Sequence, residues 1–475
     1  MTSTTRGPAA AIFPILAINV AIFAMLQSLL VPVLPIIQND LGTTPAVVTW
    51  TLTAWLLTAA VSTPILGKVG DMIGKRRTMV IALGAAALGS LVATFAPNIE
   101  LVIVGRVIQG FGAAVFPLTY GIARDEFPSA RMPSIIGALS AIMGIGSGLG
   151  TVLAGPIESA FGWRGLFWIP MVLFVASATA TRFVIPESPL RTGGKINWLA
   201  AVLLAGWLVS LLLPLSFGTR WGWASTNVIG LFIAAAVLFA AWIAVEIRSA
   251  NPLIDMKLMR LPGIWTNNLT ALLFGASMFG VWAFLPQLAQ LPASAGFGFG
   301  ASVTQSGLLV LPMLVAMAVA GFASGPIVPV VGFKYQLALG AAFVALSSAA
   351  LALFHASQWE VSVAGAVFGL GLGFGIAAMA SLIVQTAPAG QTGVASGMNS
   401  NLRTIGGAIG AALMSALVTG NLQANGQPAE IGFVAGFFAM AALATVAIAV
   451  AFLVPGTRRT TVAMDPREQL VPAQA

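Results

Sequence analysis

Long apolar runs divide this chain, and almost all of its charged residues lie in the short gaps between them. The 475 residues include 21 basic and 13 acidic side chains, and 58% of the chain is hydrophobic whereas 7% is charged. A helix that crosses a bilayer needs about 20 mostly apolar residues. The runs reach this length, so the sequence predicts an all-α polytopic membrane protein and excludes a soluble fold.

We expect fourteen membrane-spanning helices. They lie near residues 11–37, 47–66, 78–96, 101–122, 133–157, 165–185, 198–217, 228–247, 265–288, 303–330, 336–354, 361–386, 394–418 and 431–454. Two long polar stretches, 186–197 and 246–263, set the seventh and eighth spans apart. The predicted parts are an N-terminal six-helix bundle (1–190), a two-helix insert with cytoplasmic linkers (191–262), a C-terminal six-helix bundle (263–456) and a cytoplasmic tail (457–475).

The positions of the basic residues predict the orientation, because Lys and Arg in short loops are retained on the cytoplasmic side. With the N-terminus inside, eighteen of the 21 basic residues, Arg403 among them, fall on the inner side. Arg164 and Arg220 fall outside, and Arg106 alone is placed well inside an apolar run. We therefore expect both termini in the cytoplasm, a multi-pass protein of the cytoplasmic membrane, and a monomer.

The net charge of +8 reflects this inner bias, so we expect no nucleic-acid partner. The absence of Cys excludes thiolate metal sites and Cys nucleophiles, and a single His leaves no His cluster for a metal. We expect no metal, no cofactor and no catalytic residues. A polytopic membrane enzyme or assembly protein is the alternative of another class, but no pair of acids at membrane depth supports it.

A glycine-rich string follows the second apolar run and is predicted to form a tight cytoplasmic turn. Its characteristic residues are Gly67, Gly70, Asp71, Gly74, Lys75 and Arg76. The glycines allow close packing and positive φ, and Asp71 can accept hydrogen bonds from a helix N-terminus, where a carboxylate is favoured. The basic residues that end the string are expected to anchor the inner surface. An ordinary positive-inside hairpin would explain these basic residues but neither Asp71 nor the glycine spacing.

The same glycine spacing recurs in the second half of the chain. Gly67 and Gly74 correspond to Gly325 and Gly332, 258 residues later, and each pair is followed within two residues by Lys. Repeated halves are how many transporters build a central site between two bundles.

Arg106 lies inside the fourth span with Gln109 and Gly110 close by. A charge at bilayer depth costs about 2.5–3.5 kcal/mol on insertion scales, so it is a functional hypothesis by default. Arg106 and Gln109 are three residues apart and share a helix face. They can be satisfied by helix carbonyls, by water or by substrate, which leaves a structural role and a role in coupling or substrate sensing both open.

The fifth span is rich in small residues, and Gly146, Gly150, Gly155 and Pro156 stand out in it. Small residues at a spacing of four let helix backbones approach closely, and proline bends a span. We expect a flexible, closely packed helix.

These three strings resemble motifs A, B and C of the major facilitator superfamily, the last imperfectly. Residues 251–255 and 393–399 are similar to segments of its fourteen-span drug:proton antiporter branch. The resemblance implies two six-helix bundles plus two inserted helices, with gating by motif A and coupling through motif B. It also implies a transporter, most simply an exporter of small amphipathic drug-like or metabolite molecules that uses alternating access and the proton gradient. An importer or a uniporter of the same fold remains an alternative.

Members of that branch commonly carry an Asp in the first span, and Leu26 occupies this position here. The cavity is therefore expected to be neutral to positive and to favour neutral or anionic solutes. Candidate residues lining it are Asn19, Gln27, Trp55, Tyr120, Trp265, Asn267, Asn268, Trp282 and Gln287. Candidate proton sites are Asp40, Glu100 and Glu158, all at predicted outer helix ends.

Overall fold

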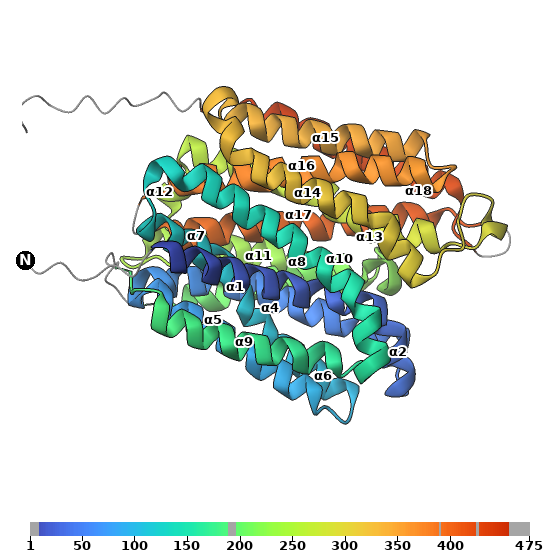
Figure 1. The fold of residues 1–475 in the computed structure, drawn as a ribbon, viewed down its shortest axis with the longest axis horizontal. Helices are drawn as coiled ribbons and strands as arrows, with labels where there is room; N and C mark the ends of the chain where they lie inside the picture. Colours follow the sequence, from blue (N-terminus) through green and yellow to red (C-terminus); the bar gives the residue numbers. More distant parts are fainter. Residues whose placement is uncertain (1–8, 189–195, 389–390, 424–426, 456–475) are drawn as a thin grey trace, which may run out of the picture.

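The computed structural model describes residues 9–188, 196–388, 391–423 and 427–455, and the fold is built from helices. The first part of the chain, which we call the N half, runs from α1 to α9 (Figure 1). Its α-helices are α1 (Ala9–Leu29), α2 (Leu34–Asp40), α3 (Pro45–Val48), α4 (Trp50–Ile73), α5 (Lys75–Thr94), α6 (Ile99–Gly110), α7 (Val115–Glu126), α8 (Met132–Phe161) and α9 (Gly165–Val184). Its short 3-10 helices are η1 (Val31–Val33), η2 (Phe111–Ala114) and η3 (Ser129–Arg131).

The insert consists of α10 (Trp198–Trp221) and α11 (Thr226–Arg248), and the short α12 (Met256–Met259) joins it to the rest of the chain. The C half then runs from α13 to α18. Its helices are α13 (Pro262–Gln290), η4 (Ala293–Ala295), α14 (Val303–Val331), α15 (Phe333–Leu353), α16 (Gln358–Thr386), α17 (Thr392–Gly420) and α18 (Glu430–Ala451).

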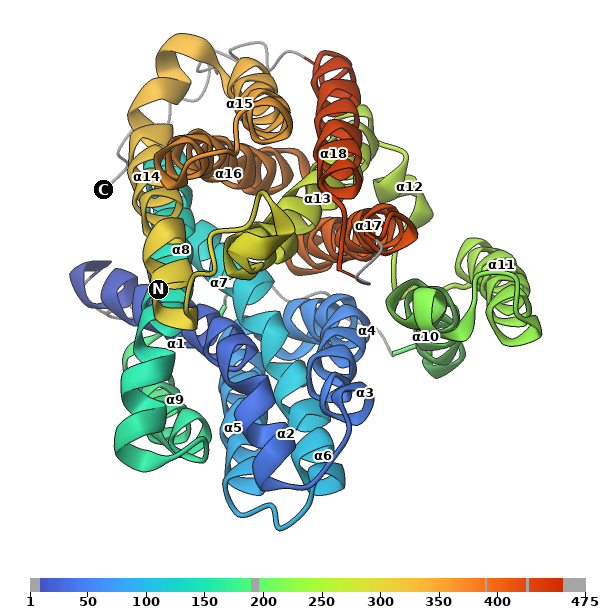
Figure 2. The ribbon, with the colours of Figure 1, turned by 90° about the vertical axis from the view of Figure 1, so that its right-hand side faces the viewer.

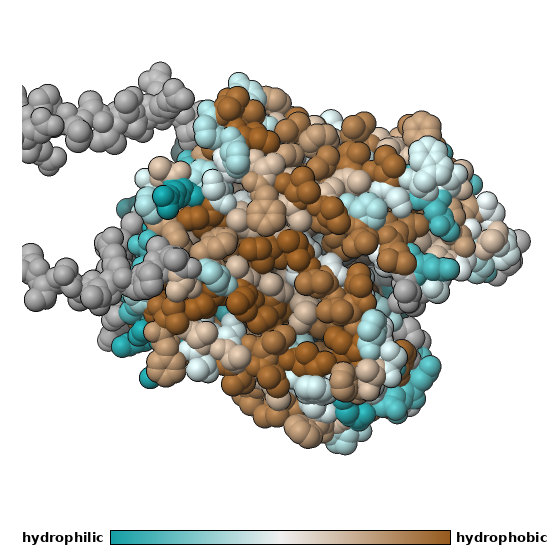
Figure 3. All heavy atoms as spheres, viewed as in Figure 1, coloured by the Kyte–Doolittle hydropathy of each residue, from teal (hydrophilic) through white to brown (hydrophobic). Residues whose placement is uncertain are grey.

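Fourteen segments of the described chain are long and apolar enough to cross a membrane, which confirms the predicted number. The fourth segment, 99–126, combines α6, η2 and α7 into one continuous span. Hydrophobic residues cover the middle of the face drawn in Figure 3, and hydrophilic residues gather towards the two ends. This banding is what a protein surrounded by lipid requires.

The glycine-rich string after the second run is mostly helical, so the predicted tight turn is present but is confined to Gly74. Helix α4 continues through Gly67 and Gly70 to Ile73, and α5 begins at Lys75. Only Gly74 breaks the helix, with φ of 117°, a value that residues other than glycine rarely adopt. Gly332 has φ of 81° between α14 and α15, so the repeated glycine makes the same break in both halves.

The two halves meet along two seams. Helix α4 of the N half packs against α17 of the C half, and α8 packs against α14. The insert contacts both sides of the first seam, because α10 packs on α4 and on α17. Figure 2 shows α10 and α11 lying beyond these two helices, at the edge of the bundle. The insert therefore covers the α4–α17 seam laterally.

The apolar cores follow the same division. One cluster of buried side chains fills the C half, where Phe274, Phe368 and Phe437 are fully buried. Another fills the N half around Phe23 and Phe174. A third joins the insert to α4, α16 and α17.

Candidate functional site

Asp71 joins the two halves at the end of the bundle where α4 ends and α17 begins, which we call the basic end. Its side chain is 1% exposed, and its Oδ1 and Oδ2 atoms accept hydrogen bonds from the backbone amides of Gly393 and Val394, at 3.3 and 3.1 Å. These amides open α17, where the helix dipole favours a negative charge. A Cβ atom at Gly67 would lie 2.6 Å from the carbonyl oxygen of Gly393, so the seam closes only with glycine there.

Arg124 makes a second link across the same seam. From the last turn of α7, its Nη1 atom donates hydrogen bonds to the carbonyl oxygen of Ala387 at 2.7 Å and to the hydroxyl of Thr392 at 2.5 Å. Together with Asp71 it holds both the end of α16 and the start of α17 to the N half. Nothing in the sequence analysis singled out Arg124, because at the end of a span it resembles any inner-side basic residue.

Lys75 does not anchor the membrane surface as predicted. Its side chain is 1% exposed, and its Nζ atom lies 2.7 Å from the Oδ2 atom of Asp125. A Cβ atom at Gly121 would come within 2.8 Å of the Lys75 side chain, so that glycine makes room for its stem. No local sequence pattern marks Asp125, because its partner is 50 residues away.

Arg76 and Gly74 contact Glu187, which follows α9. The backbone amide of Arg76 donates a hydrogen bond to Glu187 Oε1 at 3.1 Å, and its Nε atom lies 3.5 Å from Oε2. The Glu187 carboxylate also fills the space that a side chain at Gly74 would need. The start of α5 is therefore bound to the end of the N half.

The second seam lacks the charged group of the first. Gly325 of α14 packs on Ser134 of α8, much as Gly67 packs on Gly393. The 258-residue repeat places Pro329 where a counterpart of Asp71 would stand. The carboxylate latch is thus particular to α4 and α17.

Arg106 is held inside the N half. It is 1% exposed, its Nε atom donates to the carbonyl oxygen of Thr51 at 2.9 Å, and its Nη1 atom donates to Gln109 Oε1 at 2.7 Å. Gln109 in turn donates to Ser90 Oγ at 2.7 Å, and the guanidinium lies 5.4 Å from the centre of the Trp55 ring. Its Nη2 atom has no partner among the described residues. These contacts favour the structural role left open above.

Gly110 serves close packing, since a Cβ atom there would lie 2.5 Å from Thr58 of α4. In α8 the glycines divide between two neighbours. Gly146 and Gly150 approach Ala21 and Met25 of α1, whereas Gly144 and Gly148 contact α14. Gly155 has open space around it and Pro156 is exposed, so the expected close packing is wrong at these two positions.

Arg403 is a second embedded arginine, and its predicted place at the inner surface is wrong. It is the twelfth of the 29 residues of α17, roughly 16 Å along the helix from its start at 1.5 Å per residue. The first half of α17 also carries Ser396, Asn399 and Thr404, and this polarity made the true start of the span hard to place.

The amides predicted to line the cavity serve different purposes. Asn268 Oδ1 accepts a hydrogen bond from Asn399 Nδ2 at 3.0 Å, which joins α13 to α17. Asn267 donates to the carbonyl oxygen of Met379 at 2.9 Å, within the C half. Asn19 is fully buried and donates to Thr181 Oγ1 at 3.0 Å, so it joins α1 to α9 rather than lining a cavity.

The remaining cavity candidates are scattered. Trp265 is 43% exposed on the protein surface, Gln287 is also exposed, and Trp282 packs against the core of the C half. Trp55 packs beside Arg106, and Gln27 is partly buried in α1. Tyr120 is 8% exposed and lies near Arg403. The structure therefore brings Tyr120 near Arg403, and it does not collect the set at one site.

The candidate proton sites all lie at helix ends away from the basic end. Asp40 accepts a hydrogen bond from Trp163 Nε1 at 2.7 Å and lies 3.4 Å from Arg164. Glu100 is exposed in the first turn of α6, and Glu158 is partly buried in the last turn of α8. Leu26, at the position of the missing acid, is 2% exposed in the core of the N half.

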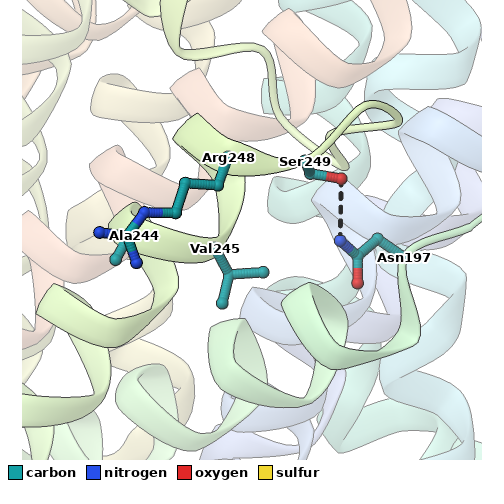
Figure 4. Close-up of a pocket in the computed structure, with 5 residues that line it drawn as sticks. All are labelled: Asn197, Ala244, Val245, Arg248 and Ser249. Carbon is teal, nitrogen blue, oxygen red and sulfur yellow. Dashed lines mark hydrogen bonds between the residues drawn. The ribbon is translucent and has the colours of Figure 1, made fainter.

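Two cavities can be described. The first, about 240 Å³, lies in the insert between α10 and α11, where Asn197, Arg248 and Ser249 are among its lining residues (Figure 4). The second, about 180 Å³, lies where α10 covers the seam. Leu56 of α4, Ser216 and Thr219 of α10, and Thr404 and Gly407 of α17 are among its lining residues.

Known proteins resemble this chain in sequence and in fold. The sequence model of the Major Facilitator Superfamily matches residues 16–198 and 188–411. A Mycobacterium tuberculosis protein described as an uncharacterized MFS-type transporter is 27% identical over 412 residues, 86% of this chain and 59% of that protein. The chain thus spans about three fifths of this relative. The tetracenomycin C resistance and export protein of Streptomyces glaucescens is 27% identical over 416 residues, 85% of this chain and 74% of that protein.

A solved structure shows the same fold. The crystal structure of the human organic anion transporter MFSD10 matches with a TM-score of 0.69, over 94% of this chain and 99% of that chain. The sequence identity is 15%, so this likeness concerns the fold alone.

Proposed function

The chain belongs to the Major Facilitator Superfamily and is a multi-pass membrane protein, and from this premise we propose that it is a secondary active transporter. It exports small amphipathic molecules, drug-like compounds or metabolites, across the cytoplasmic membrane by alternating access. The name of the Streptomyces glaucescens relative describes tetracenomycin C export, which supports this direction, and a Bacillus subtilis relative is named as a multidrug transporter.

The observation that carries the proposal is the Asp71 latch. Its hydrogen bonds to Gly393 and Val394 join the two halves at one end of a single seam. Rocking of one bundle against the other must break these bonds whenever the basic end opens. The latch therefore stabilises one of two states, which is what a gate in an alternating-access cycle requires.

We further propose that the proton gradient drives export, with Asp40, Glu100 or Glu158 as the titrating group. A uniporter is the second candidate. It is favoured by the position of the acids, because every carboxylate in the described chain lies in a loop, at a helix cap or in the first or last turn of a helix.

The test is transport by the purified chain in proteoliposomes with an imposed pH gradient and a panel of acidic, neutral and basic amphipaths. The matched variants are Asp71→Asn and Asp255→Asn. Asp255 caps the short helix α12 by accepting a hydrogen bond from the Lys257 amide, and Asn caps equally well. We expect Asp71→Asn to slow transport about fivefold or more with normal membrane insertion, and Asp255→Asn to behave as wild type.

Transport that ignores the gradient would support the uniporter, and accumulation in the opposite direction would support an importer. Failure of every solute to move would contradict the proposal. Normal transport by Asp71→Asn would reduce the latch to a packing contact.

A further inference from the structure

Arg403 is the twelfth of the 29 residues of α17, and its side chain is partly buried. Its backbone is held against α13, because a Cβ atom at Gly275 would lie 2.1 Å from the Arg403 carbonyl oxygen. Helix α17 packs on α7 of the other half, and Tyr120 of α7 lies near Arg403. The arginine therefore lies where the two halves face each other.

No acidic residue of the described chain pairs with Arg403. Arg403 forms no ion pair among the described residues. Its one hydrogen bond to a side chain is long, from Nη2 to the hydroxyl of Ser400 in its own helix at 3.4 Å. Arg106, by contrast, donates from Nε to Thr51 and from Nη1 to Gln109, and its Nη2 atom alone has no partner among the described residues. Arg403 thus has more donors without a partner among the described residues than Arg106, and it retains capacity to bind a ligand.

Polar side chains and a cavity lie near Arg403 along the same helix. Ser396 lies two turns earlier on the same face as Arg403 and is 6% exposed, and its hydroxyl has no partner among the described residues. Gly407 lies one turn later and borders the cavity of about 180 Å³, together with Phe279 and Thr404. An apolar wall with a few hydroxyl groups suits the body of an amphipathic molecule.

We propose that Arg403 is the anion-binding group of this transporter and that its substrates are amphipathic organic acids. The guanidinium donates charge-assisted hydrogen bonds to the substrate carboxylate, and the apolar body lies towards the Gly407 cavity. An unpaired charge at mid-membrane is costly, and an acidic substrate would neutralise it during passage. This assignment of substrate class rests on the proposed function.

Binding of three matched probes to the purified full chain in lipid nanodiscs tests the assignment. The probes are 1-naphthylacetate, its neutral amide and 2-(1-naphthyl)ethylamine, measured by calorimetry without any gradient. We expect wild type to bind the acid about tenfold or more tightly than the amide, the size of effect that charge-assisted hydrogen bonds give. Arg403→Gln should lose this preference, and Arg403→Lys should keep part of it. Arg248→Gln, in the separate insert cavity, is the control and should bind as wild type.

Equal affinity for the three probes, preference for the amine, or no binding of the acid by folded wild type would overturn the assignment. So would an undiminished acid preference in Arg403→Gln. Because a misfolded Arg403→Gln would be uninformative, its size-exclusion profile and Tm are compared with those of wild type. The preference of wild type for the acid over the amide is a test that does not depend on this variant. Proteoliposome transport separates the two proposals. Transport without a preference for acids would contradict only the role of Arg403, and Arg403-dependent acid binding without transport would contradict only the proposed function.

Discussion

Lys75 and Asp125 form an ion pair of 2.7 Å in which the two side chains are only 1% and 3% exposed. The pair ties the first residue of α5 to the end of α7. Asp71, four residues before Lys75, and Arg124, directly before Asp125, both bind the C half. The pair therefore fixes the two helix ends from which the seam is latched.

Asp125→Asn should destabilise the protein strongly, because it leaves the Lys75 ammonium buried without a counter-charge. Breaking a buried pair in this way costs about 3–5 kcal/mol. A thermal unfolding scan of the purified variant in detergent should show a Tm several degrees below wild type.

The double variant Lys75→Met with Asp125→Leu is the matched control, since apolar residues of similar volume often replace a buried pair at little cost. We expect its Tm to return most of the way to wild type. A double variant as unstable as the single one would show that the site depends on the charges themselves.

Gly67→Ala should open the seam at the basic end. The added methyl group would lie 2.6 Å from the Gly393 carbonyl oxygen, a distance that backbone atoms cannot relieve without moving α4 away from α17. Gly84→Ala is the control, because a Cβ atom there meets nothing within 4 Å.

The chain contains no Cys, so a pair of cysteines introduced for spin labelling would be its only thiols. Spin labels at Arg77 and Tyr335, which are 61% and 57% exposed, report the separation of the two halves at the basic end. Gly67→Ala should shift the distance distribution to longer values by several ångströms, and Gly84→Ala should not. Identical distributions for both variants would show that the seam adapts to the methyl group.

Gln109→Leu should destabilise the N half. Leucine fills a similar volume but removes the acceptor of Arg106 Nη1 and the donor to Ser90 Oγ. An unsatisfied buried polar group costs about 1–3 kcal/mol, and more where it is charged. Gln109→Glu keeps an acceptor for the arginine and should unfold close to the wild-type Tm. If Gln109→Leu and Gln109→Glu gave the same Tm, the Arg106 contacts would not stabilise the fold.

Much of the fold follows from sequence because lipid leaves few solutions for a polar backbone. Apolar runs predict fourteen spans, and the described part of the chain has fourteen such segments. The end of α4 was misplaced because glycine favours turns in water, whereas Gly67 and Gly70 are held in a helix by packing on Gly393 and Leu118. Such tertiary contacts are invisible to local propensity.

The site was only partly predictable, for a related reason. Asp71 has a recognisable pattern around it, and its expected partner, a helix N-terminus, is the one observed. Arg124 and Asp125, which also hold this end of the bundle, have no local sequence pattern, since their partners are distant in sequence. Arg403 was hidden because a polar first half of α17 resembles a loop until the contacts with α13 are known.

Glu246→Gln should loosen the connection between the insert and the C half. Glu246 is 2% exposed, and its carboxylate accepts hydrogen bonds from the backbone amides of Leu253 and Ile254, at 2.9 and 3.2 Å, and from Trp242 Nε1 at 3.1 Å. A glutamine has a single acceptor atom, so at least one of these buried donors loses its partner. Limited trypsin digestion should then cleave near Lys257 several times faster than in wild type. Glu360→Gln is the matched control, because glutamine also completes the capping box that Glu360 forms with Ser357. Equal cleavage rates in both variants would mean that packing alone, without the carboxylate, holds this connection.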